Sequence, residues 1–115
     1  MLITQSYLGP RKDFSNDALF GCWRNRHAPL ASRMPGLVSY RIGFLNGETP
    51  MLSPDGGPIL GFAELRFKDD DVRNCAYASD AGTRAGDDLK NFAREVMRFE
   101  VLEHVVIENR FFAEP

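Results

Sequence analysis

The sequence predicts an α+β domain in which two helices cover one face of an antiparallel four-stranded sheet. The 115 residues have a mass of 13.0 kDa, the size of one ordinary domain, so residues 1–115 are expected to form a single unit. Hydrophobic residues make up 43% and charged residues 26%, a balance typical of a globular chain with its own core. The period of the apolar residues changes along the chain in the order strand, helix, strand, strand, helix, strand.

The first half of the chain predicts a strand followed by a long helix. Residues 2–8 favour a strand, and Gly9-Pro10 ends it. Ser15 is a good N-cap for the helix that comes next. Apolar residues then recur at helical spacing, with one histidine among them: Leu19, Phe20, Trp23, His27, Leu30 and Met34. Pro35 is expected to end this helix, because the residue before a proline avoids helical backbone.

The middle of the chain predicts two strands joined by a long connection. Over residues 37–45 the apolar period becomes two, which places Tyr40 on the apolar face of the second strand. Residues 46–58 contain three prolines and three glycines and are expected to be an exposed connection. Residues 59–67 alternate again and predict the third strand, on which Glu64 alternates with core residues.

The last third of the chain predicts the second helical region and the final strand. Three aspartates, residues 69–71, mark a helix start, because the helix dipole favours anions there. Residues 81–85 are interpreted as a polar joint and residues 87–96 as a short helical piece. Residues 99–108, rich in valine and isoleucine, are expected to form the last strand.

Composition excludes several classes of protein. A net charge of −2 and a pI near 5.6, with no basic cluster, are not those of a nucleic-acid-binding protein. The longest uncharged run covers residues 1–10, about half of a membrane span, and no secretory signal is recognisable. Cys22 and Cys75 make no disulfide framework, which favours a reduced, cytoplasmic setting. His27 and His104 are too far apart to indicate a metal site, and no glycine-rich phosphate loop indicates a cofactor.

His27 is the candidate catalytic residue that the spacing singles out. It lies four residues after Trp23 on the apolar stripe and therefore faces the sheet. Pro29 has no N–H for the carbonyl of Asn25, so the helix is expected to kink or restart beside the histidine. A half-buried imidazole can act as a general base near neutral pH. The alternative is a core histidine bonded to a backbone carbonyl.

Four further residues are candidates for the same site. The Tyr40 hydroxyl could enter the space that His27 lines and donate to a developing oxyanion, or it could be a core tyrosine that reaches solvent. Trp23 is interpreted as packing or as a pocket wall suited to flat aromatic molecules. Glu64 is either an interface carboxylate or a second acid–base group. Asp88 is either a pocket residue or a charge in the first turn of a short helix.

These residues resemble the EthD family. The resemblance rests on Phe20-Gly-Cys-Trp-Arg-Asn-Arg-His-Ala-Pro-Leu30, on Met34-Pro-Gly-Leu37 with Tyr40, and on two weaker pieces, Gly61-Phe-Ala-Glu-Leu-Arg-Phe67 and Asp88-Leu-Lys-Asn-Phe92. It covers most of the chain and implies a ferredoxin-like fold that pairs into a dimeric α+β barrel. It also implies that His27 matches the family's proton-transfer histidine and that Tyr40 lines the pocket, while Asp88 matches an acid to which no role is assigned.

The resemblance and the residues together lead to three hypotheses about function. The first is a cofactor-free isomerase, cyclase or lyase that moves protons on a small aromatic, quinoid or lactone compound, in catabolism or polyketide tailoring. The second is a non-catalytic accessory protein that binds a hydrophobic metabolite, and the third is a cofactor-independent monooxygenase. Apolar side chains on both faces of the third and fourth strands predict that a second copy covers the open face of the sheet, giving a homodimer.

Overall fold

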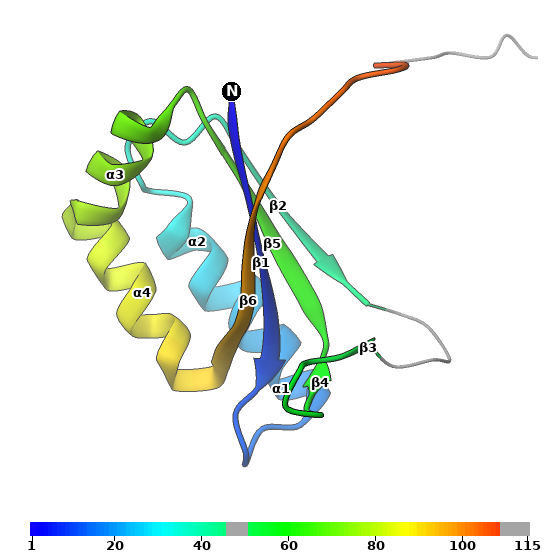
Figure 1. Cartoon of the computed structure of the whole chain (residues 1–115). Coiled ribbons are helices and arrows are strands. Elements are labelled where there is room, and N and C mark those ends of the chain that lie inside the picture. Colours follow the sequence, from blue (N-terminus) through cyan, green and yellow to red (C-terminus); the bar gives the residue numbers. More distant parts are fainter. Residues whose placement is uncertain (46–50, 109–115) are drawn as a thin grey trace, which may run out of the picture.

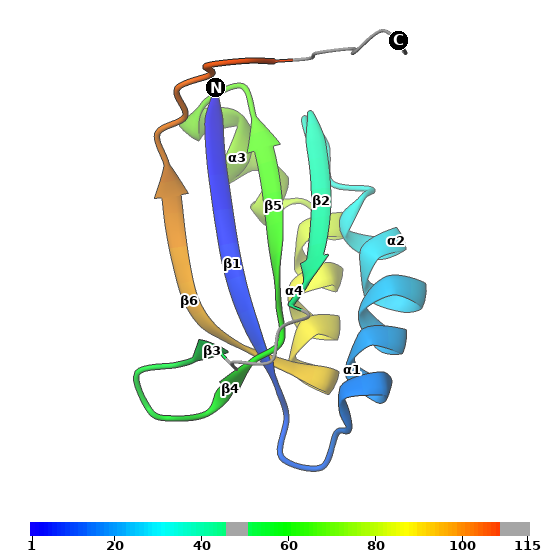
Figure 2. The ribbon, with the colours of Figure 1, turned by 90° about the vertical axis from the view of Figure 1, so that its right-hand side faces the viewer.

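The computed structural model describes residues 1–45 and 51–108, which form a four-stranded antiparallel sheet with helices on one face (Figures 1 and 2). The sheet order is β2-β5-β1-β6, as the fold class predicts. Its strands are β1 (Leu2–Pro10), β2 (Ser39–Phe44), β5 (Gly61–Phe67) and β6 (Ala93–Val101). The helical segments are α1 (Asn16–Cys22), the π-helix η1 (Trp23–His27), α2 (Ala28–Ala31), α3 (Asp70–Ala78) and α4 (Asp80–Phe92).

The register of the sheet separates an inner face, against the helices, from an outer face. In β5 the residues at 61, 63, 65 and 67 are buried, and the residues between them are only partly buried. The pairing of β1 with β5 places Leu8 opposite Gly61 and Ser6 opposite Ala63, so these β1 residues share the inner face. The outer face carries the alternate residues of each strand, with Tyr7 opposite Phe62.

The first helical region bends where the sequence predicts a disturbance. Ser15 accepts a hydrogen bond from the Ala18 amide, which confirms it as the N-cap. The α-helix gives way to a π-helix over Trp23–His27, and the Ala28 amide donates to the carbonyl of Trp23, five residues earlier. Pro29 has no amide hydrogen with which to continue the helical hydrogen bonds. The widened turn just before it accommodates the carbonyl that is left without this donor. The predicted restart beside His27 therefore takes the form of a π turn.

The second helical region corrects the sequence prediction. Residues 81–85 are not a joint, because Ser79 caps α4 by accepting from the Gly82 amide, and the helix runs on from Asp80 to Phe92. The break lies earlier, at Ser79, where the backbone is extended. Gly82 does not interrupt the helix, and a Cβ there would collide with the carbonyl oxygens of Ala76 and Tyr77. Glycine is therefore needed for the close approach of α3 and α4.

The last strand also differs from its predicted bounds. β6 covers residues 93–101 instead of 99–108, because its partner is β1, with which it pairs from Ile3–Val101 to Pro10–Ala93. A register shift between Tyr7 and Leu8 marks a β-bulge in this pair. His104 lies beyond the strand in an exposed segment and is not part of the sheet.

Part of the predicted long connection, residues 46–50, lies outside the described residues. The remainder is mostly exposed, as the sequence predicts, but it is folded, because β3 (Met51–Leu52) pairs with β4 (Pro58–Ile59) in a small hairpin. The hydroxyl of Ser53 donates to Asp55, and the Gly57 amide donates to Asp55 Oδ1 at 3.1 Å, which closes the turn. Arg94 of β6 binds the same carboxylate at 3.0 Å and ties the hairpin to the sheet.

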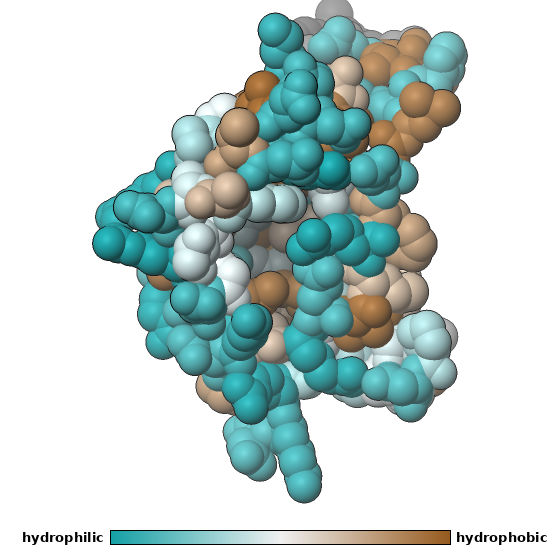
Figure 3. All heavy atoms as spheres, turned by 60° about the vertical axis from the view of Figure 1, so that its left-hand side comes forward, coloured by the Kyte–Doolittle hydropathy of each residue, from teal (hydrophilic) through white to brown (hydrophobic). Residues whose placement is uncertain are grey.

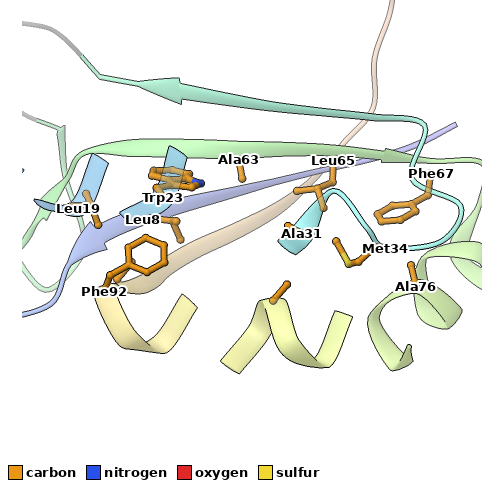
Figure 4. Packing of buried hydrophobic residues seen from close by; sticks show 12 residues of the cluster. Leu8, Leu19, Trp23, Ala31, Met34, Ala63, Leu65, Phe67, Ala76 and Phe92 are labelled. Carbon is orange, nitrogen blue, oxygen red and sulfur yellow. The ribbon is translucent and has the colours of Figure 1, made fainter. Parts of the chain in front are cut away.

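The core lies between the inner face and the helices and is bulky at both ends. Figure 4 shows Trp23 and Phe92 at one end of the cluster and Phe67 with Ala76 at the other. These four residues are fully buried, and truncating a buried phenylalanine to alanine typically costs about 3–5 kcal/mol of stability. Figure 4 shows the small side chains of Ala31 and Ala63 between these ends. Small residues between bulky ends leave room for a cavity.

Candidate functional site

A cavity of about 250 Å³ occupies this middle region, between the inner face of the sheet and the helices. Its lining residues come from every layer of the fold: Ser6, Leu8, Trp23, His27, Ala31, Met34, Tyr40, Ala63, Leu65, Tyr77, Gly82, Ala85, Gly86, Leu89, Glu95 and Arg98. Figure 3 shows a hollow in the surface of the molecule, with hydrophilic residues around it and less polar ones in its depth. A cavity of about 150 Å³ already holds benzene, so this one has room for a substituted ring.

The π turn places two predicted site residues on the cavity wall. Trp23 and His27 stand at its first and last positions, and both line the cavity. The six-membered ring of Trp23 packs against Gly61, where any Cβ would lie within 2.8 Å of the indole. Phe44 meets the same indole edge-to-face at 5.6 Å. Trp23 is thus a rigid wall of the cavity, one of the two roles that the sequence leaves open.

The imidazole of His27 is held by a carboxylate from α4. Asp88 Oδ2 lies 3.2 Å from His27 Nδ1, and Oδ1 of the same carboxylate accepts from Arg26 Nε at 2.8 Å. His27 and Asp88 are each only 8% exposed, whereas the Arg26 side chain is half exposed. An Asp88 carboxylate that accepts from Nδ1–H selects the tautomer in which Nε2 carries a lone pair. Among the described residues, no side chain or backbone group hydrogen-bonds to Nε2.

The surroundings of His27 keep it neutral. Burial lowers its pKa below the ordinary value of 6.5, because an imidazolium loses hydration in an apolar cavity. The Asp88 carboxylate opposes this effect through its charge and hydrogen bond, and the positive charge of Arg26 adds to the lowering of the pKa. A neutral imidazole with a free Nε2 is the form that accepts a proton.

Tyr40 faces the cavity from β2 with its hydroxyl protonated. Burial raises the pKa of Tyr40 above its ordinary value of 10.0, while the nearby Trp23 indole acts in the opposite direction. The geometry between the two groups is not that of a hydrogen bond, because the Trp23 Nε1 donor is buried without a partner among the described residues. Tyr40 can therefore donate its own hydrogen into the cavity.

The structure brings together four of the five predicted site residues and separates the fifth. His27, Tyr40 and Trp23 line the cavity, and Asp88 binds His27 from behind. Glu64 does not line it: the residue lies on the outer face of β5, where Gln5 Nε2 donates to it at 2.9 Å and Arg66 pairs with it at 3.3 Å. The reason is strand alternation, since Ala63 and Leu65 occupy the inner face.

Sequence reasoning missed four polar residues of the cavity. Ser6 of β1, Tyr77 of α3 and the pair Glu95 and Arg98 of β6 all line it. The sequence places Tyr77 in the second helix, but the direction of the Tyr77 side chain depends on where α3 ends. It assigns Glu95 to a helical piece and leaves Arg98 between that piece and the last strand. Simple alternation would place residues 95 and 98 on opposite faces of a strand. The β-bulge instead pairs Glu95 with Leu8 and Arg98 with Ser6, so both lie on the inner face, and no local sequence signal indicates that bulge.

Neither a metal centre nor a membrane span is found in the described part of the chain. No group of three or more histidine, cysteine, aspartate or glutamate side chains there could hold a metal ion. None of the described helices is long and apolar enough to cross a bilayer.

The fold and this cavity define a ferredoxin-like α+β protein with a cavity between sheet and helices. No protein-family model and no curated protein matches the sequence, whereas solved structures match its fold. An EthD family protein from Bacillus halodurans is 24% identical, with a TM-score of 0.70, over 90% of this chain and all of that one. A dimeric protein of unknown function and ferredoxin-like fold from Bacteroides fragilis is 12% identical, with a TM-score of 0.61, over 87% of this chain and 91% of the other.

A third similar structure is that of SnoaB from Streptomyces nogalater, a cofactor-independent oxygenase. It is 12% identical to this chain in its N63A mutant form, with a TM-score of 0.64, over 93% of this chain and 97% of that one. At these identities the likeness establishes the fold. It confirms the fold that the sequence resemblance to EthD proteins implies, and it leaves the reaction to be inferred from the site.

Proposed function

We propose that this protein is an EthD-like acid–base enzyme that moves a proton on a small cyclic compound, such as an aromatic, quinoid or lactone ring. The observation that carries the proposal is the buried pair of His27 and Asp88 at the wall of a largely apolar cavity. Isomerisations, cyclisations and eliminations that run through an enolate all begin with removal of a proton from carbon beside a carbonyl. Each needs one base in a desolvated site and a donor for the oxyanion that develops.

His27 is the base in this proposal. Its neutral imidazole presents Nε2 to the cavity, and Asp88 stabilises the imidazolium formed once the proton is taken. Asp88 acts as a positioning residue, since it touches His27 and is not among the cavity-lining residues. Tyr40 supplies the hydrogen bond to the enolate oxygen, because its raised pKa keeps the phenol protonated.

The proposal is tested by comparing the two histidines of the chain. The wild type is incubated with panels of aromatic acids, quinones and unsaturated lactones, and products are followed by mass spectrometry. A substrate found in this way should be turned over about 10²–10⁴ times more slowly by His27→Gln. His104→Gln is the matched control, since His104 is exposed and lies outside the cavity. Full activity of His27→Gln would overturn the role of His27.

The Asp88→Asn variant tests whether Asp88 positions His27 or only shapes the cavity. The variant keeps the shape of the side chain but removes the acceptor charge, so the preferred tautomer of His27 is lost. We expect kcat to fall while KM changes little, because substrate contacts stay the same. A change in KM alone would show that Asp88 shapes the cavity and does not act through His27.

A cofactor-independent monooxygenase is the second candidate, and the fold likeness to SnoaB favours it. Both reactions begin with a proton transfer that leaves an enolate or phenolate anion, but this anion reacts with oxygen only in the monooxygenase. Oxygen consumption that depends on substrate would identify the oxygenase, whereas an isomerase or lyase works equally well under nitrogen. Recovery of every bound compound unchanged would instead favour the third hypothesis, an accessory protein that binds a metabolite.

We further propose that the protein is a homodimer formed through the outer face of the sheet. The similarity to a dimeric protein of ferredoxin-like fold supports it. So does an aromatic cluster on the outer face, in which Tyr7 lies 5.7 Å from Phe62 and 6.0 Å from Phe99 between ring centroids. Phe99 is 49% exposed in the single chain. An exposed aromatic cluster of this kind is typical of a protein–protein interface.

A further inference from the structure

The cavity wall has a second group of polar side chains, which the proposed chemistry does not use. His27 lies on the helix η1, whereas Glu95 and Arg98 reach the cavity from β6 and Tyr77 reaches it from α3. The Arg98 guanidinium lies 5.5 Å from the centre of the Tyr77 ring, and Nη2 of Arg98 donates to Glu95 Oε2 at 2.9 Å. The side chain of Arg98 is 49% exposed, so the cavity opens to solvent at this group.

Most of the donors of Arg98 remain uncommitted. A guanidinium has five N–H groups, and among the described residues only one of them, on Nη2, has a hydrogen-bond partner. The Tyr77 ring holds the guanidinium over its face by cation–π contact. The Tyr77 hydroxyl is a donor too, since burial raises the pKa of this phenol above 10.0.

Glu95 does not use up the hydrogen-bond donors of Arg98 and Tyr77. Its pair with Arg98 joins two residues three apart on one strand surface, and exposed pairs of this kind contribute little. The single contact with Glu95 leaves one edge of the guanidinium free. A planar carboxylate of a ligand in the mouth of the cavity could bind this edge through two parallel hydrogen bonds. Arg73, the nearest other arginine acting on Tyr77, is committed to Glu100 at 2.7 Å.

We propose that Arg98 and Tyr77 form a carboxylate-binding subsite at the mouth of the cavity. The ligand class is then a flat cyclic carboxylate, with its anionic group at Arg98 and its ring against Leu8, Leu65 and Leu89 on the way to His27. This inference rests on the proposed function to the extent that both need a small molecule in the cavity. It adds the charge and orientation of that molecule, which the acid–base chemistry leaves open.

The test compares 2-naphthoate with 2-naphthamide, which has the same ring and no charge. Isothermal titration calorimetry at pH 7.5 is expected to show that the wild type binds the carboxylate about tenfold more tightly than the amide. Arg98→Gln should remove this preference and leave amide binding unchanged. Glu95→Gln should increase it, because the competing carboxylate is gone. Quenching of Trp23, the single tryptophan of the chain, reports entry of either probe into the cavity.

Arg94→Gln is the matched control, since Arg94 is also on β6, is 41% exposed and pairs with Asp55 instead of facing the cavity. It should keep the preference for the carboxylate. Equal binding of both probes by the wild type, or no binding of either, overturns the subsite. Loss of the preference in Arg94→Gln as well as in Arg98→Gln also overturns it, because overall charge would then be the cause. The proposed function fails separately, through an active His27→Gln variant.

Discussion

The buried position of His27 has a consequence for stability as well as for catalysis. A histidine whose pKa is lowered on folding binds protons more weakly in the folded than in the unfolded chain. Above pH 6.5 the imidazole is neutral in both states and the native fold keeps its full stability. As the pH falls below 6.5 the unfolded chain is protonated first, so the free energy of unfolding decreases until the lowered folded pKa is passed.

We therefore predict that His27 accounts for part of the acid sensitivity of the fold. The free energy of unfolding, measured with urea between pH 7.5 and pH 5.0, should fall more steeply in the wild type than in His27→Gln. One group contributes at most about 1.4 kcal/mol per pH unit to this slope. His104→Gln, at an exposed site, should behave like the wild type. Parallel curves for the wild type and His27→Gln would contradict the direction of the shift.

The residues of the site show how far sequence reasoning reaches. His27 and Trp23 both line the cavity, because their spacing of four residues puts them on one helical stripe, whether the turn is α or π. The position of Tyr40 comes from strand alternation. Asp88 can be assigned to a helix, but its contact with His27 joins residues 61 apart in sequence, and no local pattern encodes such a contact. Glu64 lies on the outer face, where it can be the interface carboxylate that the sequence leaves open but not a cavity-lining acid–base group, and the alternation of β5 already indicates this.

At the scale of elements, local propensity is right about helix starts and wrong where pairing partners decide. Ser15 and Asp69 cap their helices as expected, since a cap is a local interaction. The predicted last strand is shifted because residues 105–107 have strong strand propensity, yet β1 pairs only as far as Val101. The valine- and isoleucine-rich segment beyond it is exposed instead, with Val106 83% exposed.

The helix α4 offers a prediction about the cavity at this scale. Gly86 lines the cavity from α4, and a Cβ built there meets no atom within 4 Å. Gly86→Leu should therefore fill the mouth and weaken binding of any cavity ligand. The fold should become more stable by about 0.5–1 kcal/mol, because leucine is the better helix former. Calorimetric titration of a cavity ligand and urea unfolding measure the two effects.

Gly21 provides the matched control in α1. It is also helical, and a Cβ there also meets nothing within 4 Å, but it does not line the cavity. Gly21→Leu should show the same gain in stability with unchanged ligand affinity. If the two variants weaken binding equally, the ligand does not enter the cavity through the region of Gly86.

For the whole molecule, the open outer face is the feature that the single chain leaves unexplained. The helices cover only the inner face (Figure 2), so the aromatic cluster of Tyr7, Phe62 and Phe99 has no cover from the described elements. Beyond β6 the chain carries further exposed apolar residues, among them Leu102, which is fully exposed. A second copy related by a twofold axis would bury the aromatic cluster and these apolar residues at once, since each copy presents the same surface to the other.

We predict that the wild type has twice the 13.0 kDa chain mass in solution and that Phe99→Arg is monomeric. The substitution places a charge at the proposed interface, and burying an unpaired charge costs several kcal/mol. Light scattering after size-exclusion chromatography gives the mass. Val38→Arg is the control, because Val38 is 57% exposed, an equally apolar site that precedes β2 and lies away from the aromatic cluster. It should remain dimeric, and a monomeric wild type would show that another partner covers the outer face.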